Sequence, residues 1–167
     1  TGRWGSASAE GAYLAAQATY GTTPTAHTRD DIIHSKLVLL WGWNPAETVQ
    51  GSDTTYRLVL AKEKGTKFVS LDPRYTNTAA LLADQWIPVR PGTDTALLLA
   101  MSFVIIERGL QDQHFIDRYT VGFETFKDYL LGKEDGIAKT PAWAEPITGV
   151  SASAIEDLAV QYALCKP

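Results

Sequence analysis

Short apolar runs that end in polar loops recur three times in the first part of the chain. Residues 37–41 (LVLLW) have the length and composition of a strand that is buried on both faces, which is typical of a parallel sheet. Residues 67–71 and 86–89 are similar short runs, and each is followed by residues that favour a turn. The pattern therefore predicts three strands, each of which opens into a loop at its carboxyl end.

Helical patterns separate and follow these runs. Residues 53–64 (DTTYRLVLAKEK) carry apolar positions at helical spacing before Gly65, and residues 95–109 (TALLLAMSFVIIERG) are a strongly apolar helix that closes at Gly109. A strand, a helix and a second strand in this order are typical of a βαβ unit. We therefore expect an α/β fold, in which a short parallel sheet of the Rossmann-like, dinucleotide-binding type has helices on both faces.

The rest of the chain shows helical patterns without residues that indicate chemistry. Ser153 and Glu156 have the spacing of a capping box, which predicts a last helix through Ala163. Further helices are expected over residues 112–119, 123–131 and 140–146. We expect no catalytic role for this region.

The first residues of the chain are rich in small side chains, and residues 9–19 are compatible with a helix. We expect residues 1–30 to lead into the domain and residues 31–167 to form one α/β domain. A chain of 167 residues that opens on Thr1 is expected to be an internal fragment of a larger protein.

Polar residues gather in the three loops that follow the predicted strands. Parallel strands end at one edge of a sheet, and open α/β sheets bind their ligands there. Taken singly, each residue is better explained by a turn or a helix cap, but their recurrence in this order favours a binding edge. The candidate ligand-binding residues are Gly42, Asn44, Glu47, Thr48, Leu71, Asp72, Pro73, Arg74, Gly92, Thr93 and Asp94.

Composition excludes several classes of protein. Hydrophobic residues make up 45% of the chain and the net charge is -4, so a globular core is expected, and neither nucleic acid nor an anionic membrane surface is favoured as a partner. No apolar stretch reaches the roughly 20 residues of a membrane span. The single Cys165 excludes an internal disulfide and a cysteine-based cluster motif, and His27, His34 and His114 lack the spacing of metal ligands.

Three blocks of sequence resemble a known family. The segments WGWNPAET, LDPRYTNTAALLADQWIPVRPGTDTALLLA and TPAWAEPITGVSASAIEDLA resemble the molybdopterin oxidoreductases of the dimethyl sulfoxide reductase family, most closely the DmsA-like catalytic subunits. The resemblance runs from about residue 8 to the end, and the DPR and RPGTD blocks are its most specific parts. It implies a large enzyme with molybdenum bis(molybdopterin guanine dinucleotide), an iron–sulfur cluster domain before this region and further cofactor-binding segments after it.

The resemblance also implies an activity and a set of partners for the parent enzyme. That enzyme would catalyse oxygen-atom transfer, the reduction of an S-oxide or N-oxide such as dimethyl sulfoxide, in anaerobic respiration. Its partners would be an iron–sulfur electron-transfer subunit, a membrane anchor subunit and the small-molecule oxide, with no nucleic acid. Exported members carry a twin-arginine signal, so the periplasmic face of the membrane is expected. The fragment would bind one dinucleotide and be inactive alone.

Within this resemblance, the loops would hold an anionic cofactor with guanine at one end. Arg74 would pair with a phosphate, and the helix N-termini after Thr48 and Asp94 would favour the pyrophosphate. A carboxylate suits guanine because it accepts hydrogen bonds from N1 and the exocyclic amine together. Asp94 and Asp72 are the candidates, one for guanine and the other for the ribose hydroxyls, and we favour Asp94 for guanine.

DmsA-like enzymes also coordinate molybdenum through a serine oxygen that precedes the first loop. Ser8 matches that position best and would be both the metal ligand and the catalytic residue, while Ser6 is the alternative. A helix N-cap explains either serine equally well. Neither cysteine nor histidine occupies the candidate position, so the cysteine or selenocysteine ligation of formate dehydrogenase and nitrate reductase relatives is not supported.

Two other functions are compatible with the same architecture. An NAD-dependent dehydrogenase domain shares it, but GWNPAE follows the first predicted strand where GxGxxG would be expected. A non-catalytic nucleotide-binding module, such as the central domain of thiamine diphosphate enzymes, is physically possible because a fold does not specify chemistry.

Overall fold

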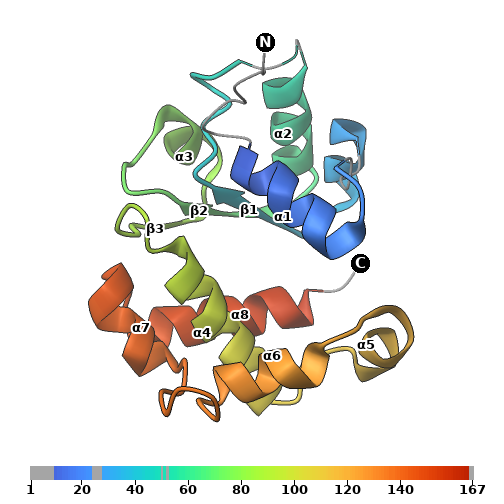
Figure 1. Cartoon of the computed structure of the whole chain (residues 1–167). Helices are drawn as coiled ribbons and strands as arrows, with labels where there is room; N and C mark the ends of the chain where they lie inside the picture. Colours follow the sequence, from blue (N-terminus) through green and yellow to red (C-terminus); the bar gives the residue numbers. More distant parts are fainter. Residues whose placement is uncertain (1–9, 24–27, 50, 52, 166–167) are drawn as a thin grey trace, which may run out of the picture. The chain divides into compact units, whose positions relative to one another are not determined.

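The computed structural model describes residues 10–23, 28–49, 51 and 53–165 (Figure 1). The chain divides into two units, residues 1–31 and 32–167, and each is described by itself. The first unit contains helix α1 (Glu10–Tyr20), which is formed by the segment of small residues that the sequence showed to be compatible with a helix. The 3-10 helix η1 (Arg29–His34) spans the boundary between the units.

Three parallel strands form the sheet of the second unit. They lie in the order β1-β2-β3, and their bounds are β1 (Leu37–Trp41), β2 (Lys67–Leu71) and β3 (Gln85–Ile87). Trp41 pairs with Leu71, and Leu71 pairs with Ile87, so all three strands end at one edge. The first two strands match the predicted runs residue for residue. The third ends before Pro88, which has no N–H to donate to the ladder.

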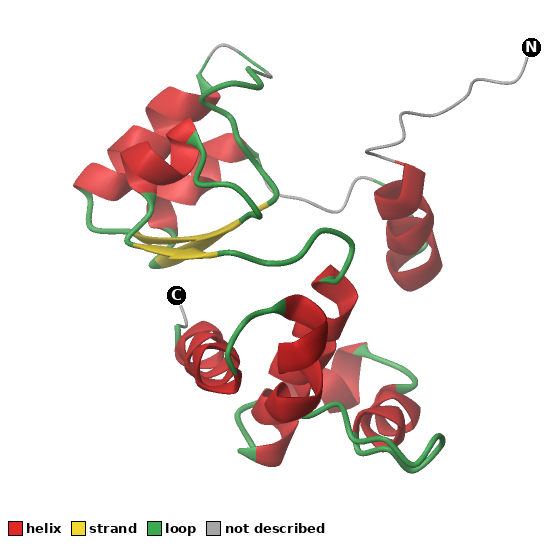
Figure 2. Ribbon diagram, turned by 90° about the vertical axis from the view of Figure 1, so that its left-hand side faces the viewer, coloured by secondary structure: helices red, strands yellow, loops and turns green. Residues whose placement is uncertain are grey.

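Helices cover both faces of this sheet, as the sequence predicts (Figure 2). On one face, Leu40 and Phe68 form a buried cluster with residues of α2 (Thr54–Glu63) and α3 (Asn77–Leu82). On the other face, Val69 and Leu71 belong to a larger cluster. Its helical members come from α4 (Asp94–Glu107), α7 (Pro141–Thr148) and α8 (Ala152–Leu164). Alternate strand residues therefore point into two separate cores.

The expected helices after the sheet are present, but the N-cap predicted for the last of them is wrong. They include α5 (Gln113–Tyr119) and α6 (Phe123–Leu130). The capping box predicted from Ser153 and Glu156 is wrong, because Ser151 caps α8 by accepting from the amide of Ala154 at 3.3 Å. Gly149 ends α7 in a left-handed conformation, and Ser151 is then the first serine in extended backbone.

Helix α3 was not predicted, because its six residues are too few to show a helical period. Its N-cap is Thr76, whose hydroxyl accepts from the amide of Ala79 at 3.1 Å. The most apolar helix is α4, which has 14 residues. Within the described ranges, no helix combines the length and apolar character needed to cross a membrane.

Asp84 continues the pairing of β2 with β3 by means of its side chain. Its amide donates to the carbonyl of Phe68 at 2.8 Å, and its Oδ2 accepts from the amide of Phe68 at 2.8 Å. Lys62 of α2 donates to Oδ1 of the same carboxylate. The hydrogen bond from Lys62 and that from the Phe68 amide hold the pKa of Asp84 below its ordinary value. One carboxylate thus joins the start of β2 to α2 and to the connection before β3.

We expect Asp84→Ala to destabilise the chain by about 1–2 kcal/mol, because the amide of Phe68 loses its acceptor. Asp84→Asn keeps an acceptor oxygen and loses only the half-exposed ion pair, which is worth less than about 1 kcal/mol. The pKa of Asp84 is lower in the folded chain than in the unfolded chain. The stability that the ionised Asp84 carboxylate contributes is therefore complete above the ordinary pKa of aspartate, and it is lost as the pH falls through the pKa in the folded chain. Urea unfolding at several pH values measures both effects.

Asp128→Asn is the control, because the carboxylate of Asp128 takes part in an exposed ion pair with Lys133. An Asp84→Ala chain that unfolds at the same urea concentration as this control would contradict the proposed role of Asp84.

Candidate functional site

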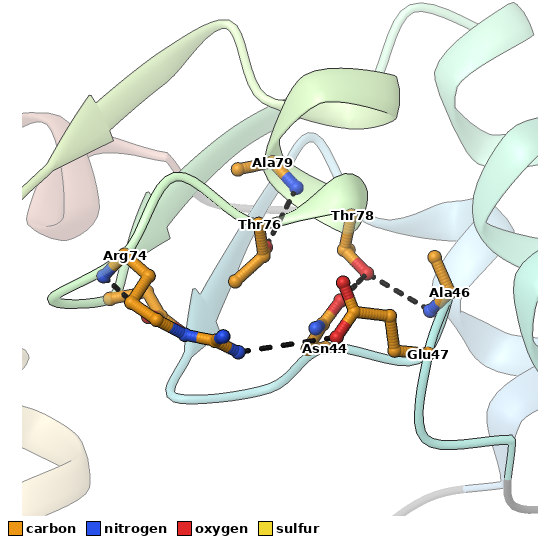
Figure 3. Close-up of polar contacts among 8 residues, drawn as sticks. Asn44, Ala46, Glu47, Arg74, Thr76, Thr78 and Ala79 are labelled. Carbon is orange, nitrogen blue, oxygen red and sulfur yellow. Dashed lines mark hydrogen bonds and ion pairs between the residues drawn. The ribbon is translucent and has the colours of Figure 1, made fainter.

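The ends of the three strands bring the three polar loops together, as Figure 3 shows for the first two. Arg74 Nη2 of the second loop lies 4.0 Å from Glu47 Oε2 of the first. The indole Nε1 of Trp41, the last residue of β1, donates to Oδ1 of Asp94 at 2.7 Å, which ties the third loop to the same edge. The prediction that these loops share one rim of the sheet is confirmed.

The first loop leaves β1 through Gly42 and then folds into a tight turn. Gly42 has a φ of 55°, which an L side chain rarely adopts, and its amide donates to the carbonyl of Leu71 at 2.9 Å. The carbonyl of Asn44 accepts from the amides of Glu47 at 3.1 Å and Thr48 at 2.8 Å. The turn leaves the side chain of Glu47 45% exposed beside Arg74.

A threonine of α3 fixes this turn from outside the loop. The hydroxyl of Thr78 donates to Asn44 Oδ1 at 2.6 Å and accepts from the amide of Ala46 at 3.0 Å (Figure 3). Thr78 is buried, with 1% of its surface exposed, whereas Asn44 and Ala46 are partly buried. The short helix α3 therefore sets the conformation of the loop after β1.

The second loop combines a buried carboxylate with an exposed cation. Asp72 is 9% exposed, and its Oδ1 accepts from the amide of Arg74 at 2.9 Å across Pro73. The carbonyl of Asp72 accepts from the indole Nε1 of Trp86 at 2.9 Å. Asp72 therefore shapes the turn, while the side chain of Arg74 is 74% exposed and directed toward Glu47.

The third loop is held at its start by the C-terminal end of α7. Arg90 donates through Nη1 to the carbonyl of Pro146, and its amide donates to the carbonyl of Thr148 at 2.9 Å. Gly92 turns the chain at a φ of 78°, and the Thr93 hydroxyl donates to the carbonyl of Arg90 at 2.7 Å. Thr93 is the N-cap of α4 but makes no side-chain cap bond.

The structure does not show Leu71 or Ser8, two of the predicted site residues, with a side chain that could contact a ligand at this edge. Leu71 is fully buried, so it can contribute to a site only through its backbone. Ser8 and its alternative Ser6 lie outside the described residues. In the part of the chain that the structure describes, no group of three His, Cys, Asp or Glu side chains is arranged to hold a metal ion.

The arrangement offers complementary groups to one ligand. Arg74 presents an exposed cation to an anionic group, and Asp94 presents carboxylate oxygens to N–H donors. A nucleotide carries both kinds of group, phosphates at one end and a base with N–H donors at the other. The edge therefore offers the two kinds of group that a nucleotide would require.

Neither Thr78 nor Trp41 is among the site residues predicted from the sequence. Thr78 acts through a helix that the pattern did not reveal, and Trp41 contacts a residue 53 positions further along the chain. The sequence gives one local indication that Trp41 lies near the site, which is its position at the end of the apolar run before the first polar loop.

Comparison with known proteins agrees with this geometry. The family model described as "Molybdopterin oxidoreductase" matches residues 3–157. "Dimethyl sulfoxide reductase DmsA" of Escherichia coli is 43% identical over 164 residues, covering 89% of this chain and 20% of that protein. The protein of the same name from Haemophilus influenzae is 44% identical over 152 residues, covering 82% of this chain and 19% of that protein.

A structural comparison gives the same result. "Acetylene Hydratase from Pelobacter acetylenicus" matches with a TM-score of 0.66 and 31% identity, covering 83% of this chain and 19% of that one. The chain thus spans about a fifth of the length of these relatives. The parallel sheet, the loops at its edge and the match over residues 3–157 agree: the chain belongs to the molybdopterin oxidoreductases, as part of an enzyme of the dimethyl sulfoxide reductase family.

Proposed function

We propose that the loops at the carboxyl edge of the sheet bind the guanosine end of one molybdopterin guanine dinucleotide. The observation that carries this proposal is the convergence of Arg74 and Asp94 on the edge where the three strands end. Arg74 would bind a phosphate, and Asp94 would accept hydrogen bonds from guanine. Glu47 and Asp72 then remain for the ribose hydroxyls, with Asp72 acting mainly through the turn that it stabilises.

The residues at the edge fit such a ligand. A Cβ atom placed on Gly42 or Gly92 would meet no atom of another part of the chain within 4 Å, so the space over both turns is open. A backbone without side chains allows phosphates to approach closely. Arg74 is exposed enough to turn from Glu47 to an anion, because ion pairs at the surface contribute less than about 1 kcal/mol.

When bound, the cofactor would supply a redox-active metal held by dithiolene sulfurs. The residues of this chain would bind and orient the nucleotide end, far along the cofactor from the metal. Asp94 would hold the guanine and Arg74 a phosphate of the nucleotide, and the Thr78 hydroxyl would keep the first loop in its binding conformation.

The reaction of the whole enzyme is a proposal that rests on its relatives. The proteins at 43% and 44% identity are named dimethyl sulfoxide reductases, which supports oxygen-atom transfer from an S-oxide or N-oxide. A more distant relative, at 35% identity, is named "Pyrogallol hydroxytransferase large subunit", so the substrate does not follow from the family. We further propose an iron–sulfur subunit, a membrane anchor subunit and a periplasmic location for the parent enzyme.

If Ser8 supplies the metal's oxygen ligand, Ser8→Ala in the full-length enzyme should change the EPR signal of the metal and abolish oxide reduction while the pterin content stays near that of the wild type. A helix cap would behave differently, because its loss costs about 0.5–2 kcal/mol of stability and leaves the metal's spectrum unaltered. An active Ser8→Ala enzyme with the wild-type spectrum would transfer the ligand role to Ser6.

Asp94→Asn is expected to lower the cofactor content of the full-length enzyme. The amide places a donor where guanine N1 also donates, and a mismatched buried pair costs about 1–3 kcal/mol. Molybdenum and the GMP released by acid hydrolysis measure the content. Asp112→Asn is the control, because Asp112 caps α5 away from the edge and asparagine caps as well as aspartate. Full occupancy in Asp94→Asn would remove Asp94 from the guanine role.

Thr78→Val tests whether the first loop must be held in place. Valine has nearly the same shape as threonine but leaves the Ala46 amide and Asn44 Oδ1 without their buried partner, at a cost of about 1–3 kcal/mol. We expect reduced GMP content in the purified enzyme, whereas Thr78→Ser, which keeps the hydroxyl, should load nearly as the wild type does. Equal GMP content in the two variants would show that this network does not support binding.

A further inference from the structure

We propose that Trp41 is a positioning residue for guanine recognition, because its indole N–H holds the carboxylate of Asp94 in the orientation that accepts two hydrogen bonds from one base. The inference rests on the proposed binding of guanine by Asp94. It goes beyond that proposal by assigning base selectivity to a residue that would not itself contact the nucleotide.

The position of the Trp41 indole is determined by the core. Trp41 is the last residue of β1, and its partly buried side chain packs against the cluster formed by β2, β3, α4, α7 and α8. Its Nε1 lies 2.7 Å from Oδ1 of Asp94. An indole has one N–H and no acceptor, so a ring fixed by packing also fixes the direction of its hydrogen bond.

Asp94 needs such a constraint because nothing in its own side chain supplies it. The second torsion angle of aspartate is broad, so a carboxylate without a partner rotates easily about the Cβ–Cγ bond. Asp94 begins α4, and its backbone is fixed by the helix while its carboxylate is only partly buried. The bond from Trp41 fixes the plane of the carboxylate relative to the end of β1.

The bond leaves enough acceptor capacity for a base. An ionised carboxylate has about four lone-pair sites on two oxygens, and Trp41 uses one of them. Both oxygens therefore retain a site for guanine, one for N1–H and one for the exocyclic amine. Preorganising the carboxylate lowers the entropy lost on binding, and it favours the ligand that uses both oxygens over one that uses a single oxygen.

Trp86 provides a matched control at the same edge. Its indole Nε1 also donates at 2.9 Å, but the acceptor is the backbone carbonyl of Asp72, which cannot rotate as a carboxylate does. Trp86→Phe removes an indole hydrogen bond from the edge of the sheet without changing the contacts of Asp94. A general loss of stability at the edge would therefore affect both tryptophan variants. A loss of carboxylate orientation would affect only Trp41→Phe.

The test measures binding of guanosine diphosphate and inosine diphosphate to the full-length protein prepared without cofactor. Inosine lacks the exocyclic amine, so the ratio of the two dissociation constants reports the two-oxygen contact. We expect a ratio of about ten in the wild type and in Trp86→Phe, and a ratio of about three or less in Trp41→Phe, with inosine diphosphate affinity nearly unchanged. In an Asp94→Ala background, Trp41→Phe should have no further effect on the ratio.

Two results would overturn the inference: an unchanged ratio in Trp41→Phe, with or without an equal loss of affinity for both nucleotides, or an additive effect in the Asp94→Ala background. Trp41→Leu is a second variant without an indole N–H. A wild-type ratio in either variant, provided that it folds, also overturns the inference. Failure of the underlying function looks different. If guanosine diphosphate does not bind the wild type, or if Asp94→Ala leaves the ratio unchanged, Asp94 does not recognise guanine.

Discussion

Parallel pairing of the three strands is the constraint on which the rest of the structure depends. Because β1, β2 and β3 run the same way and pair Trp41, Leu71 and Ile87 across the sheet, each strand must deliver its following loop to the same edge. The two connections between strands return along one face through α2 and α3, and helices that follow β3 cover the other face. The loops at residues 42–48, 72–74 and 92–94 are thereby gathered at one rim although they are distant in the sequence.

The loops at this rim are held by groups of the neighbouring helices and strand. The hydroxyl of Thr78 in α3 fixes the turn after β1, the last carbonyls of α7 hold Arg90, and the Trp41 indole holds Asp94. If this edge binds the nucleotide as proposed, it is preorganised, because the groups that would face the ligand do not need to order themselves on binding. The helical region beyond the sheet therefore contributes to the site without supplying a ligand contact.

The sequence predicted the parts of this fold whose signals are local. β1 and β2 were predicted residue for residue, because apolar runs bounded by polar turn residues are distinctive, and the meeting of the loops follows from parallel pairing. α3 was missed because its six residues show no period. The pattern favours Ser153 as the cap of α8, because Ser153 has a glutamate three residues later and Ser151 does not, but the end of α7 at Gly149 makes Ser151 the cap. The contact of Trp41 with Asp94 spans 53 residues and follows from no local pattern.

The measurement that tests the account most directly is an experimental structure of the full-length enzyme with its cofactor bound. The account predicts a guanine base whose N1 and exocyclic amine lie within hydrogen-bonding distance of the two carboxylate oxygens of Asp94, with Arg74 near a phosphate. A guanine bound elsewhere, with Asp94 and Arg74 both remote from the dinucleotide, would contradict the claim that this edge is the nucleotide-binding site.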